Sequence, residues 1–483
     1  MIKEKLFNKE ITSYCILAVI SIMCVTLFCK SSPIYPICDL PDANTWLIQA
    51  KQVLSGLVPY KDIYEHKGPL QIFAYLFAAL PCFNRFEGLY ITELVLFIIY
   101  SIGVYKTSKL FGEKYNLLAT IISIFVVSLS SAFSATGSSE ELLLSTFIWS
   151  VYFMVKNIQR NQIFKPFDVL LIGAFCAIRL WTKYNLCFFD VILVVYVLAY
   201  YIKNKWNIWK TILYYILGFA CVTVPLLIYF AVKGALYDLF YVYFYIVIFK
   251  YYTAVGSIHN YNTFIIKALT VMPVILCMLP NIIDIRSKNR KKEDVFYLIT
   301  FFLFFIYIVY SSTWWSYYFL DLFAFLIFFV TKSLNNKPKF SLPILIVVIA
   351  SMFVINSSQI ETFKFDKSEY KQFEIAEIVN SVDNPKLYYY QAENGGFYIY
   401  SDTMPFTRYF TNYNINAEEV ADERQQVIEN KEADFLLTIQ QNDFDGYTLV
   451  KETQIPNWDV VFDEKFNKGY KQYYLYEKAE NLK

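Results

Sequence analysis

The run Ile11-TSYCILAVISIMCVTLF-Cys29 contains no charged residue and indicates the class of the protein. Its length of about 19 residues matches the roughly 20 that a helix needs to cross a bilayer. Lys3, Lys5 and Lys9 precede it, so it also resembles a secretory signal peptide. It lacks a small-residue cleavage site, and we therefore expect an uncleaved first membrane span.

Similar apolar runs recur along the chain and predict about eleven spans. They cover residues 11–29, 87–105, 115–134, 141–157, 167–183, 186–202, 211–232, 263–283, 295–312, 317–332 and 341–357. The composition agrees, since 57% of the residues are hydrophobic and 17% are charged, against about a quarter charged in soluble domains. The predicted fold class is an all-α membrane protein with a small C-terminal α/β domain.

The basic residues indicate the orientation of these spans, because cytoplasmic loops are rich in Lys and Arg. The clusters are Lys3/Lys5/Lys9, Lys106/Lys109/Lys114, Lys156/Arg160/Lys165, Lys203/Lys205/Lys210, Arg286 to Lys292 and Lys332/Lys337/Lys339. All fall on one side if 69–82 does not span. That segment has about a dozen apolar residues, roughly 20 Å of helix, and we place it in the outer interface. The N-terminus is then cytoplasmic.

Three segments are then outside the membrane: the loop 30–88, the aromatic-rich 236–262 and the tail 358–483. Within the loop, 42–57 has an apolar face formed by Ala43, Trp46, Leu47, Ala50, Leu54 and Leu57. This pattern is typical of a helix lying flat on a membrane. The tail predicts helices at 369–382 and 417–430 and strands at 386–391, 434–439, 447–452 and 472–476. We divide the chain into a membrane domain, 1–357, and an extracytoplasmic α/β domain, 358–483.

Charged residues gather in four places on the predicted outer side. The clusters contain Asp39 and Asp42; Asp62, Glu65 and Lys67; Glu140 and Glu141; and Arg179 and Lys183. Polar residues at a membrane are costly and are candidates for function. A carboxylate can accept a proton from a hydroxyl, and a cation can stabilise a departing phosphate. These groups suit the transfer of a sugar from a lipid phosphate to an alcohol.

Each cluster also has a structural interpretation. Asp42 follows Pro41 and could be a helix N-cap. Glu140 and Glu141 open a helix, where acids complement the macrodipole. Arg179 and Lys183 could extend toward lipid headgroups. Other observations exclude partners: a net charge of +2 argues against nucleic acid, the two histidines are too few for a histidine-based metal site, and the nine cysteines show no metal-ligand spacing.

Three motifs resemble a known family. They are Pro41-Asp-Ala-Asn-Thr-Trp46, Ser55-Gly-Leu-Val-Pro-Tyr-Lys-Asp62 and Glu65-His-Lys-Gly-Pro-Leu70. Together they are similar to the first outer loop of the GT-C glycosyltransferases, which include protein mannosyltransferases and the aminoarabinose transferases of lipid A. The similarity is greatest to bacterial cell-surface polysaccharide relatives, and its motifs cover about residues 38–190.

The resemblance implies roles for individual residues. It places the candidate general base at Asp42, with Asp39 as the alternative, and the contact to the lipid phosphate at Lys67. The family's second acid falls on Glu140 or Glu141, between which the sequence does not choose. Lys183 matches a Thr-Lys element and, with Arg179, is a candidate for binding the phosphate. Asp39, Asp62 and Glu65 are candidates for support. The family varies in metal use, so a divalent ion stays open.

The hypothesis is an inverting glycosyltransferase in a bacterial inner membrane. Its donor is a polyprenyl-phosphate monosaccharide, and its acceptor is a glycan or lipid of the cell envelope; other partners are membrane lipids. Two alternatives remain. A polysaccharide polymerase or ligase also uses lipid-linked glycans, but typically has a large arginine-rich outer loop. A transporter would have polar residues near mid-membrane and repeated halves, which the sequence does not display.

Overall fold

The computed structural model describes most of the chain. The described residues are 2–38, 40–83, 85–130, 132–133, 136–251, 272–278, 292–311, 316–336, 338–361, 370–390, 392, 394–410, 418–456 and 470–482. They form two compact units, which are described separately below. The first comprises Met1–Ile34, Tyr90–Leu226 and Ile258–Thr362, and the second comprises Tyr35–Leu89, Leu227–Ser257 and Phe363–Lys483.

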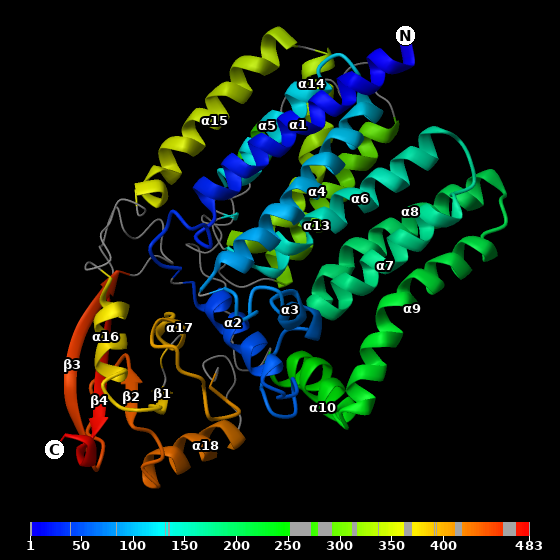
Figure 1. Cartoon of the computed structure of the whole chain (residues 1–483). Helices are drawn as coiled ribbons and strands as arrows, with labels where there is room; N and C mark the ends of the chain where they lie inside the picture. The colour runs from blue at the N-terminus through cyan, green and yellow to red at the C-terminus, as the bar shows by residue number, and fades with distance from the viewer. Residues whose placement is uncertain are drawn as a thin grey trace. The chain divides into compact units, whose positions relative to one another are not determined.

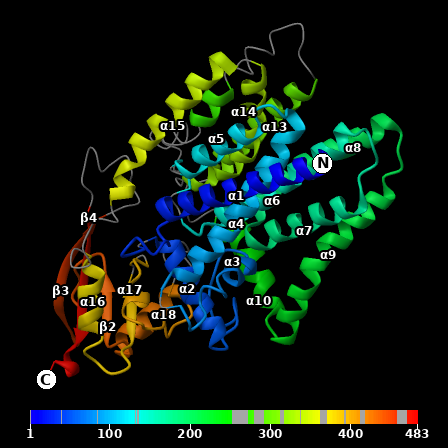
Figure 2. The same cartoon turned by 45° about the horizontal axis from the view of Figure 1, so that its top comes forward.

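The first unit is a bundle of apolar helices. Figures 1 and 2 show α1, α4, α5 and α6 running side by side within it. Its helices are α1 (Ile2–Phe28), α4 (Glu87–Phe111), α5 (Asn116–Ser128), α6 (Ser139–Gln159), α7 (Pro166–Thr182), η1 (Tyr184–Cys187), α8 (Phe188–Asn204), α9 (Trp209–Val232), α13 (Lys292–Ser311), η3 (Ser316–Phe325), α14 (Leu326–Asn336) and α15 (Pro338–Glu361). Their apolar faces meet in one core, which includes Phe97, Phe133 and Phe147.

Five helices in the described residues are long and apolar enough to cross a membrane. They are Glu10–Phe28, Glu87–Phe111, Tyr184–Asn204, Trp209–Val232 and Tyr317–Asn336. A helix also lies at each remaining predicted span, except that only 272–278 of the predicted span 263–283 is described. The helical membrane class is therefore confirmed, while the number of about eleven spans stays a prediction.

The helices α7 and α9 pack closely because each has a glycine at the contact. A Cβ atom on Gly173 would lie 2.1 Å from the carbonyl oxygen of Tyr215, and one on Gly218 would lie 1.9 Å from that of Leu170. Small residues let helix backbones approach in membranes, where packing and not hydrophobicity drives association. This contact supports α7, the helix that carries Arg179.

The second unit joins segments far apart in sequence. Its first part contains α2 (Pro41–Leu54) and α3 (Pro69–Ala74), its second α10 (Leu236–Phe240) and the π-helix η2 (Tyr241–Tyr251). Its third part is the tail. The Cys38 N–H donates to the Tyr400 hydroxyl at 2.8 Å, and the Tyr64 N–H donates to the Arg408 carbonyl at 3.1 Å. The first outer loop, which we assigned to the membrane domain, therefore packs with the tail.

The helix α2 confirms the helix expected at 42–57. Trp46, Leu47 and Ala50 are buried, and so is Gln52 on the opposite side. The Gln52 side chain donates to the Pro405 carbonyl at 3.3 Å. The tail therefore covers α2 at Gln52, while Lys51 stays partly exposed.

The helix α3 has six residues, about 9 Å of helix, and turns follow it to residue 82. Such a segment is too short to cross a membrane as a helix, which agrees with our prediction that 69–82 does not span.

In the aromatic-rich segment 236–262, α10 and η2 form one helical run. Its aromatic rings stack four residues apart, Tyr237 on Tyr241 and Tyr241 on Tyr245. Residues 252–262 of this segment lie outside the described residues.

The tail forms a four-stranded sheet in the order β1-β2-β4-β3. Its elements are α16 (Lys371–Val379), β1 (Leu387–Tyr390), α17 (Phe397–Tyr400), α18 (Glu418–Glu429), β2 (Phe435–Thr438), β3 (Tyr447–Pro456), β4 (Tyr470–Lys478) and η6 (Ala479–Asn481). β1 and β2 are parallel, and the other pairs are antiparallel. All six predicted elements of the tail are confirmed. Within the part of the tail that the structure describes, the short α17 and η6 were not predicted.

Candidate functional site

The segment that carries Lys67 is held in place by hydrogen bonds within the second unit. The Tyr60 hydroxyl donates to the Lys67 carbonyl at 2.7 Å, and the Asp62 carboxylate accepts from the Val58 N–H at 2.8 Å. The Arg408 guanidinium donates to the Tyr60 carbonyl at 2.6 Å. Tyr60 itself is buried and has a left-handed backbone, with φ of 67°, which is unusual for a bulky residue. The local structure therefore fixes where Lys67 lies.

Glu65 shapes the same turn. Its carboxylate accepts from the backbone N–H groups of His66 and Lys67, at 2.8 and 2.9 Å. Burial raises the pKa of Glu65, while the hydrogen bond from the Lys67 N–H opposes that shift. Both Lys67 and Asp42 act electrostatically on this carboxyl, so the structure brings these three charged residues together. Lys67 is itself buried, at 8% exposure.

Asp42 lies in the first turn of α2 and is half-buried. The N-cap residue is Leu40, so the interpretation of Asp42 as the N-cap is wrong. The preceding segment is anchored by the Asn44 side chain, which donates to the carbonyls of Cys38 at 2.9 Å and Leu40 at 2.8 Å. Asp42 is thus presented by a fixed helix start. Asp39 lies outside the described residues.

In the first unit, Glu140 and Lys183 form a buried ion pair. Glu140 is fully buried, Lys183 is 6% exposed, and the Lys183 ammonium lies 3.5 Å from the centre of the Tyr318 ring. The interpretation that Lys183 only extends toward headgroups is therefore wrong. The second oxygen of Glu140, Oε2, has no hydrogen-bond partner among the described residues.

Glu141 has different contacts from Glu140. Ser138 caps α6 by accepting from the Glu141 N–H at 3.2 Å, and the Glu141 carboxylate accepts from the Gly137 N–H at 2.8 Å. This exchange resembles a capping box, which satisfies the free N–H groups of a helix start. The Cys29 thiol also donates to Glu141. The geometry gives Glu141 a structural role and leaves Glu140 as the acid beside Lys183.

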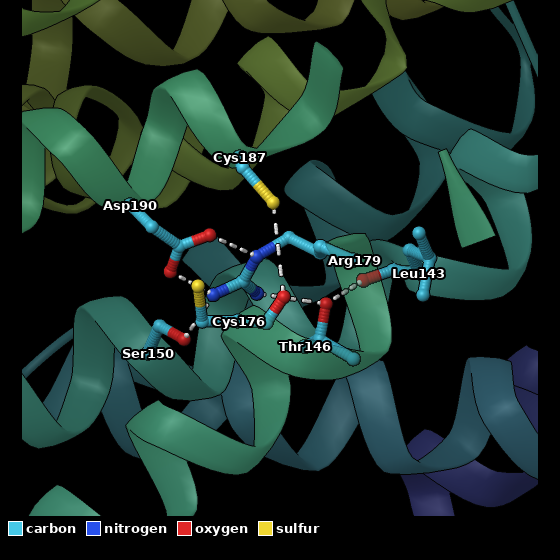
Figure 3. Close-up of polar contacts among 7 residues, drawn as sticks. All are labelled: Leu143, Thr146, Ser150, Cys176, Arg179, Cys187 and Asp190. Atoms are coloured by element: carbon cyan, nitrogen blue, oxygen red, sulfur yellow. Dashed lines mark hydrogen bonds and ion pairs between the residues drawn. The ribbon is translucent and has the colours of Figure 1, made fainter. Parts of the chain in front are cut away.

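Arg179 is the centre of a buried polar network, shown in Figure 3. Its Nε donates to Asp190 Oδ2 at 2.8 Å, and its Nη2 bonds the other oxygen of Asp190. Further donors bond the hydroxyls of Thr146 at 2.9 Å and Ser150 at 3.2 Å. The side chain has no exposed surface, so it does not extend to headgroups. These contacts join α6, α7 and α8 and support the turn that carries Lys183.

Asp321 belongs to this region, although it lies in none of the four charged clusters of the sequence. It is fully buried in η3, and its electrostatic neighbours include Glu140, Lys183 and Arg179. Neither of its carboxylate oxygens has a hydrogen-bond partner among the described residues. The signal that identifies it in sequence is a single acid within the predicted span 317–332.

An apolar cavity of about 270 Å³ borders the Arg179 network. It lies among α6, α7, α8 and α9, and its walls include Met154, Ile172, Leu193 and Tyr215 together with Asp190. A cavity with this lining suits a hydrocarbon chain and not a polar ligand.

Two groups of side chains have the residue types and spacing for a metal: Cys29, Glu93 and Glu141, and Cys176, Cys187 and Asp190. In the second, both oxygens of Asp190 already bond the positively charged Arg179, so this group does not fit a cation. In the first, Glu93 accepts from the Ser31 hydroxyl, and one Glu93 oxygen has no partner among the described residues.

Comparison with known proteins is informative at the level of fold. No protein-family model matches the chain, and no characterised protein matches its sequence. ArnT from Cupriavidus metallidurans bound to undecaprenyl phosphate is similar in structure, with a TM-score of 0.64 and 10% identity over 97% of this chain and 98% of ArnT. The apo state of the same ArnT gives a TM-score of 0.63 and 9% identity over 99% of both chains. An Archaeoglobus fulgidus oligosaccharyltransferase tethered with an acceptor peptide gives a TM-score of 0.48 and 10% identity, over 88% of this chain and 68% of the oligosaccharyltransferase. The chain therefore shares the fold of ArnT over nearly all of its length.

Proposed function

We propose that this protein is a membrane glycosyltransferase. It moves a monosaccharide from a polyprenyl phosphate to a hydroxyl group of a cell-envelope glycan or lipid, with inversion at the anomeric carbon. The observation that carries the proposal is the position of Asp42 and Lys67, one half-buried acid and one buried lysine that both act on Glu65 in a hydrogen-bonded unit. The ArnT structure of the same fold binds undecaprenyl phosphate, which supports a lipid-phosphate donor.

In the proposed reaction, the acceptor oxygen attacks the anomeric carbon while the bond from that carbon to the phosphate oxygen breaks. Asp42 accepts the hydroxyl proton, as a general base must do from within hydrogen-bond reach. The lipid phosphate leaves with the bonding electron pair. Lys67 stabilises this charge, and its burial strengthens the interaction because little water competes.

The residues of the first unit are assigned to the donor. Lys183 is proposed to bind the phosphate or the sugar next to it, with Glu140 holding its ammonium. Arg179 supports Lys183 through the α7 turn, where the Lys183 N–H donates to the Arg179 carbonyl at 2.8 Å. The apolar cavity among α6 to α9 is proposed to take part of the lipid chain. Chelation in the same assay tests whether transfer requires a divalent ion.

The test is sugar transfer from a set of radiolabelled polyprenyl-phosphate monosaccharides in membranes. We expect one donor to be consumed, and Lys67→Met to lose about 100-fold or more in rate, as expected when a group that stabilises developing charge is removed. Lys51→Met is the matched control, because Lys51 lies in the same unit on the partly exposed side of α2. It should retain wild-type activity.

The outcomes separate the alternatives. Equal consumption by wild type and Lys67→Met would leave the enzyme class but remove Lys67 from its site. If folded wild-type protein consumes no monosaccharide donor yet consumes a lipid-linked oligosaccharide, the polymerase or ligase becomes the better assignment.

We also propose that the N-terminus is cytoplasmic and the tail lies outside a bacterial inner membrane. In a variant without its native cysteines, a cysteine introduced at the exposed Asp445 should react with a membrane-impermeant maleimide in spheroplasts. A cysteine introduced at exposed Lys205, on the predicted cytoplasmic side, should react only after lysis. The reverse pattern would overturn the orientation.

A further inference from the structure

Three carboxylate oxygens around Lys183 are buried without a hydrogen-bond partner among the described residues. They are Oε2 of Glu140 and both oxygens of Asp321. Buried polar atoms are almost always bonded, and each exception requires an explanation. A buried carboxylate oxygen without a partner carries a desolvation penalty that no hydrogen bond offsets. Its presence here therefore suggests a ligand that completes the bonding.

The backbone of η3 places Asp321 on the side facing Lys183. η3 is a 3-10 helix of ten residues, in which residues three apart lie on the same face. Tyr318 is three residues before Asp321, and its ring lies 3.5 Å from the Lys183 ammonium. Such long 3-10 runs are uncommon. The electrostatic influence of Glu140, Lys183 and Arg179 on Asp321 agrees with this placement.

The nature of the unpaired atoms defines the ligand. Carboxylate oxygens accept hydrogen bonds and do not donate them. The ammonium of Lys183 already pairs with Glu140, and the three remaining oxygens have no donor among the described residues. A ligand is therefore the source of donors that we consider. Neighbouring hydroxyl groups on a sugar ring supply several donors in a small volume. A phosphate oxygen does not, because it is an acceptor like the carboxylates.

We propose that Asp321 and Glu140 form a binding site for the hydroxyl groups of the donor sugar. This inference rests on the proposed function and deepens it, because it assigns recognition of the sugar to residues other than those assigned to the lipid phosphate. Asp321 accepts from one or two ring hydroxyls, and Glu140 Oε2 accepts from another. Lys183 keeps the two acids at one site without mutual repulsion.

The experiment compares binding of two lipids to the purified full chain: the polyprenyl-phosphate monosaccharide that is consumed, and bare polyprenyl phosphate. Wild type should bind the sugar-bearing lipid more tightly. In Asp321→Asn that preference should fall by roughly 10- to 150-fold, the value of a hydrogen bond to a charged group. Affinity for bare polyprenyl phosphate should stay unchanged, which also shows that the variant folds.

Donors lacking single hydroxyls provide the second measurement. Removal of the recognised hydroxyl should lower kcat/KM for wild type, and the same donor should cost Asp321→Asn little more, since the interaction is already lost. Asp321→Leu should melt at a higher temperature than wild type while losing transfer, as expected for an acid kept for function and not for stability. Glu140→Gln should show the same loss of sugar preference.

Each result has a distinct meaning. If Asp321→Asn keeps the full preference for the sugar-bearing lipid, the inference is wrong and the proposed transferase stands. If wild type neither binds nor consumes any polyprenyl-phosphate monosaccharide, the proposed function itself fails, and the inference with it.

Discussion

Asp42→Asn is expected to reduce sugar transfer at least about 100-fold, because general base catalysis contributes roughly 10²- to 10⁴-fold. The amide has nearly the same shape as the carboxylate but cannot accept the hydroxyl proton. The residue begins α2 but is not its N-cap, so the helix should form normally. We therefore expect a fall in kcat, measured with saturating donor, with little change in donor affinity or melting temperature.

The matched control is Asp402→Asn in the same unit. Asp402 is exposed and has a left-handed backbone, with φ of 51°, a conformation that Asn adopts as readily as Asp. This variant should keep wild-type transfer and stability. Full activity in Asp42→Asn would exclude Asp42 as the base, whatever the effect of Lys67→Met.

Arg179→Met should produce the largest loss of stability. The change leaves Asp190 as a buried carboxylate without its cation, and removal of one partner from a buried pair costs about 3–5 kcal/mol. The hydroxyls of Thr146 and Ser150 also lose a donor. We expect a clear fall in the melting temperature of the purified protein, accompanied by loss of transfer.

Two further variants identify the cause of that loss. Lys109→Met removes a similar ion pair, to Glu10, whose side chains are 34% and 41% exposed, and it should have little effect because exposed pairs contribute about 0–1 kcal/mol. The double variant Arg179→Met/Asp190→Leu replaces both charges by apolar groups and should recover much of the stability. A wild-type melting temperature for Arg179→Met alone would contradict the structural role.

The sequence predicted those features that depend on neighbouring residues. Uninterrupted apolar runs predicted the helices of the first unit, and short β-rich segments predicted the strands at 386–391 and 434–439. The motifs at Asp42 and Lys67 were found because they lie close together in one loop. Short motifs in the sequence also predicted Glu140 and Lys183 as site residues. Their contact was not predicted, because 43 residues separate them in the sequence.

Other features depend on contacts that a single sequence does not contain. α2 looked like a helix at a membrane surface because its polar side includes Gln52, whose partner Pro405 is 353 residues away. Asp321 was not predicted as a site residue because the segment 317–332 is otherwise apolar, and we interpreted the whole segment as a membrane span. Arg179 was interpreted as a phosphate ligand because its three hydrogen-bond partners, Asp190, Thr146 and Ser150, lie on other helices, α6 and α8. Only packing brings these helices together.

The union of the first loop with the tail has a consequence for biogenesis. The bonds that position Asp42 and Lys67 end on Tyr400 and Arg408, which leave the ribosome long after residues 35–89. At a synthesis rate of about 5–20 residues per second, these partners are made roughly tens of seconds or less after the loop. During that interval the nascent chain carries the motifs around Asp42 and Lys67 without the contacts that order them, so the proposed activity requires synthesis to have passed Arg408.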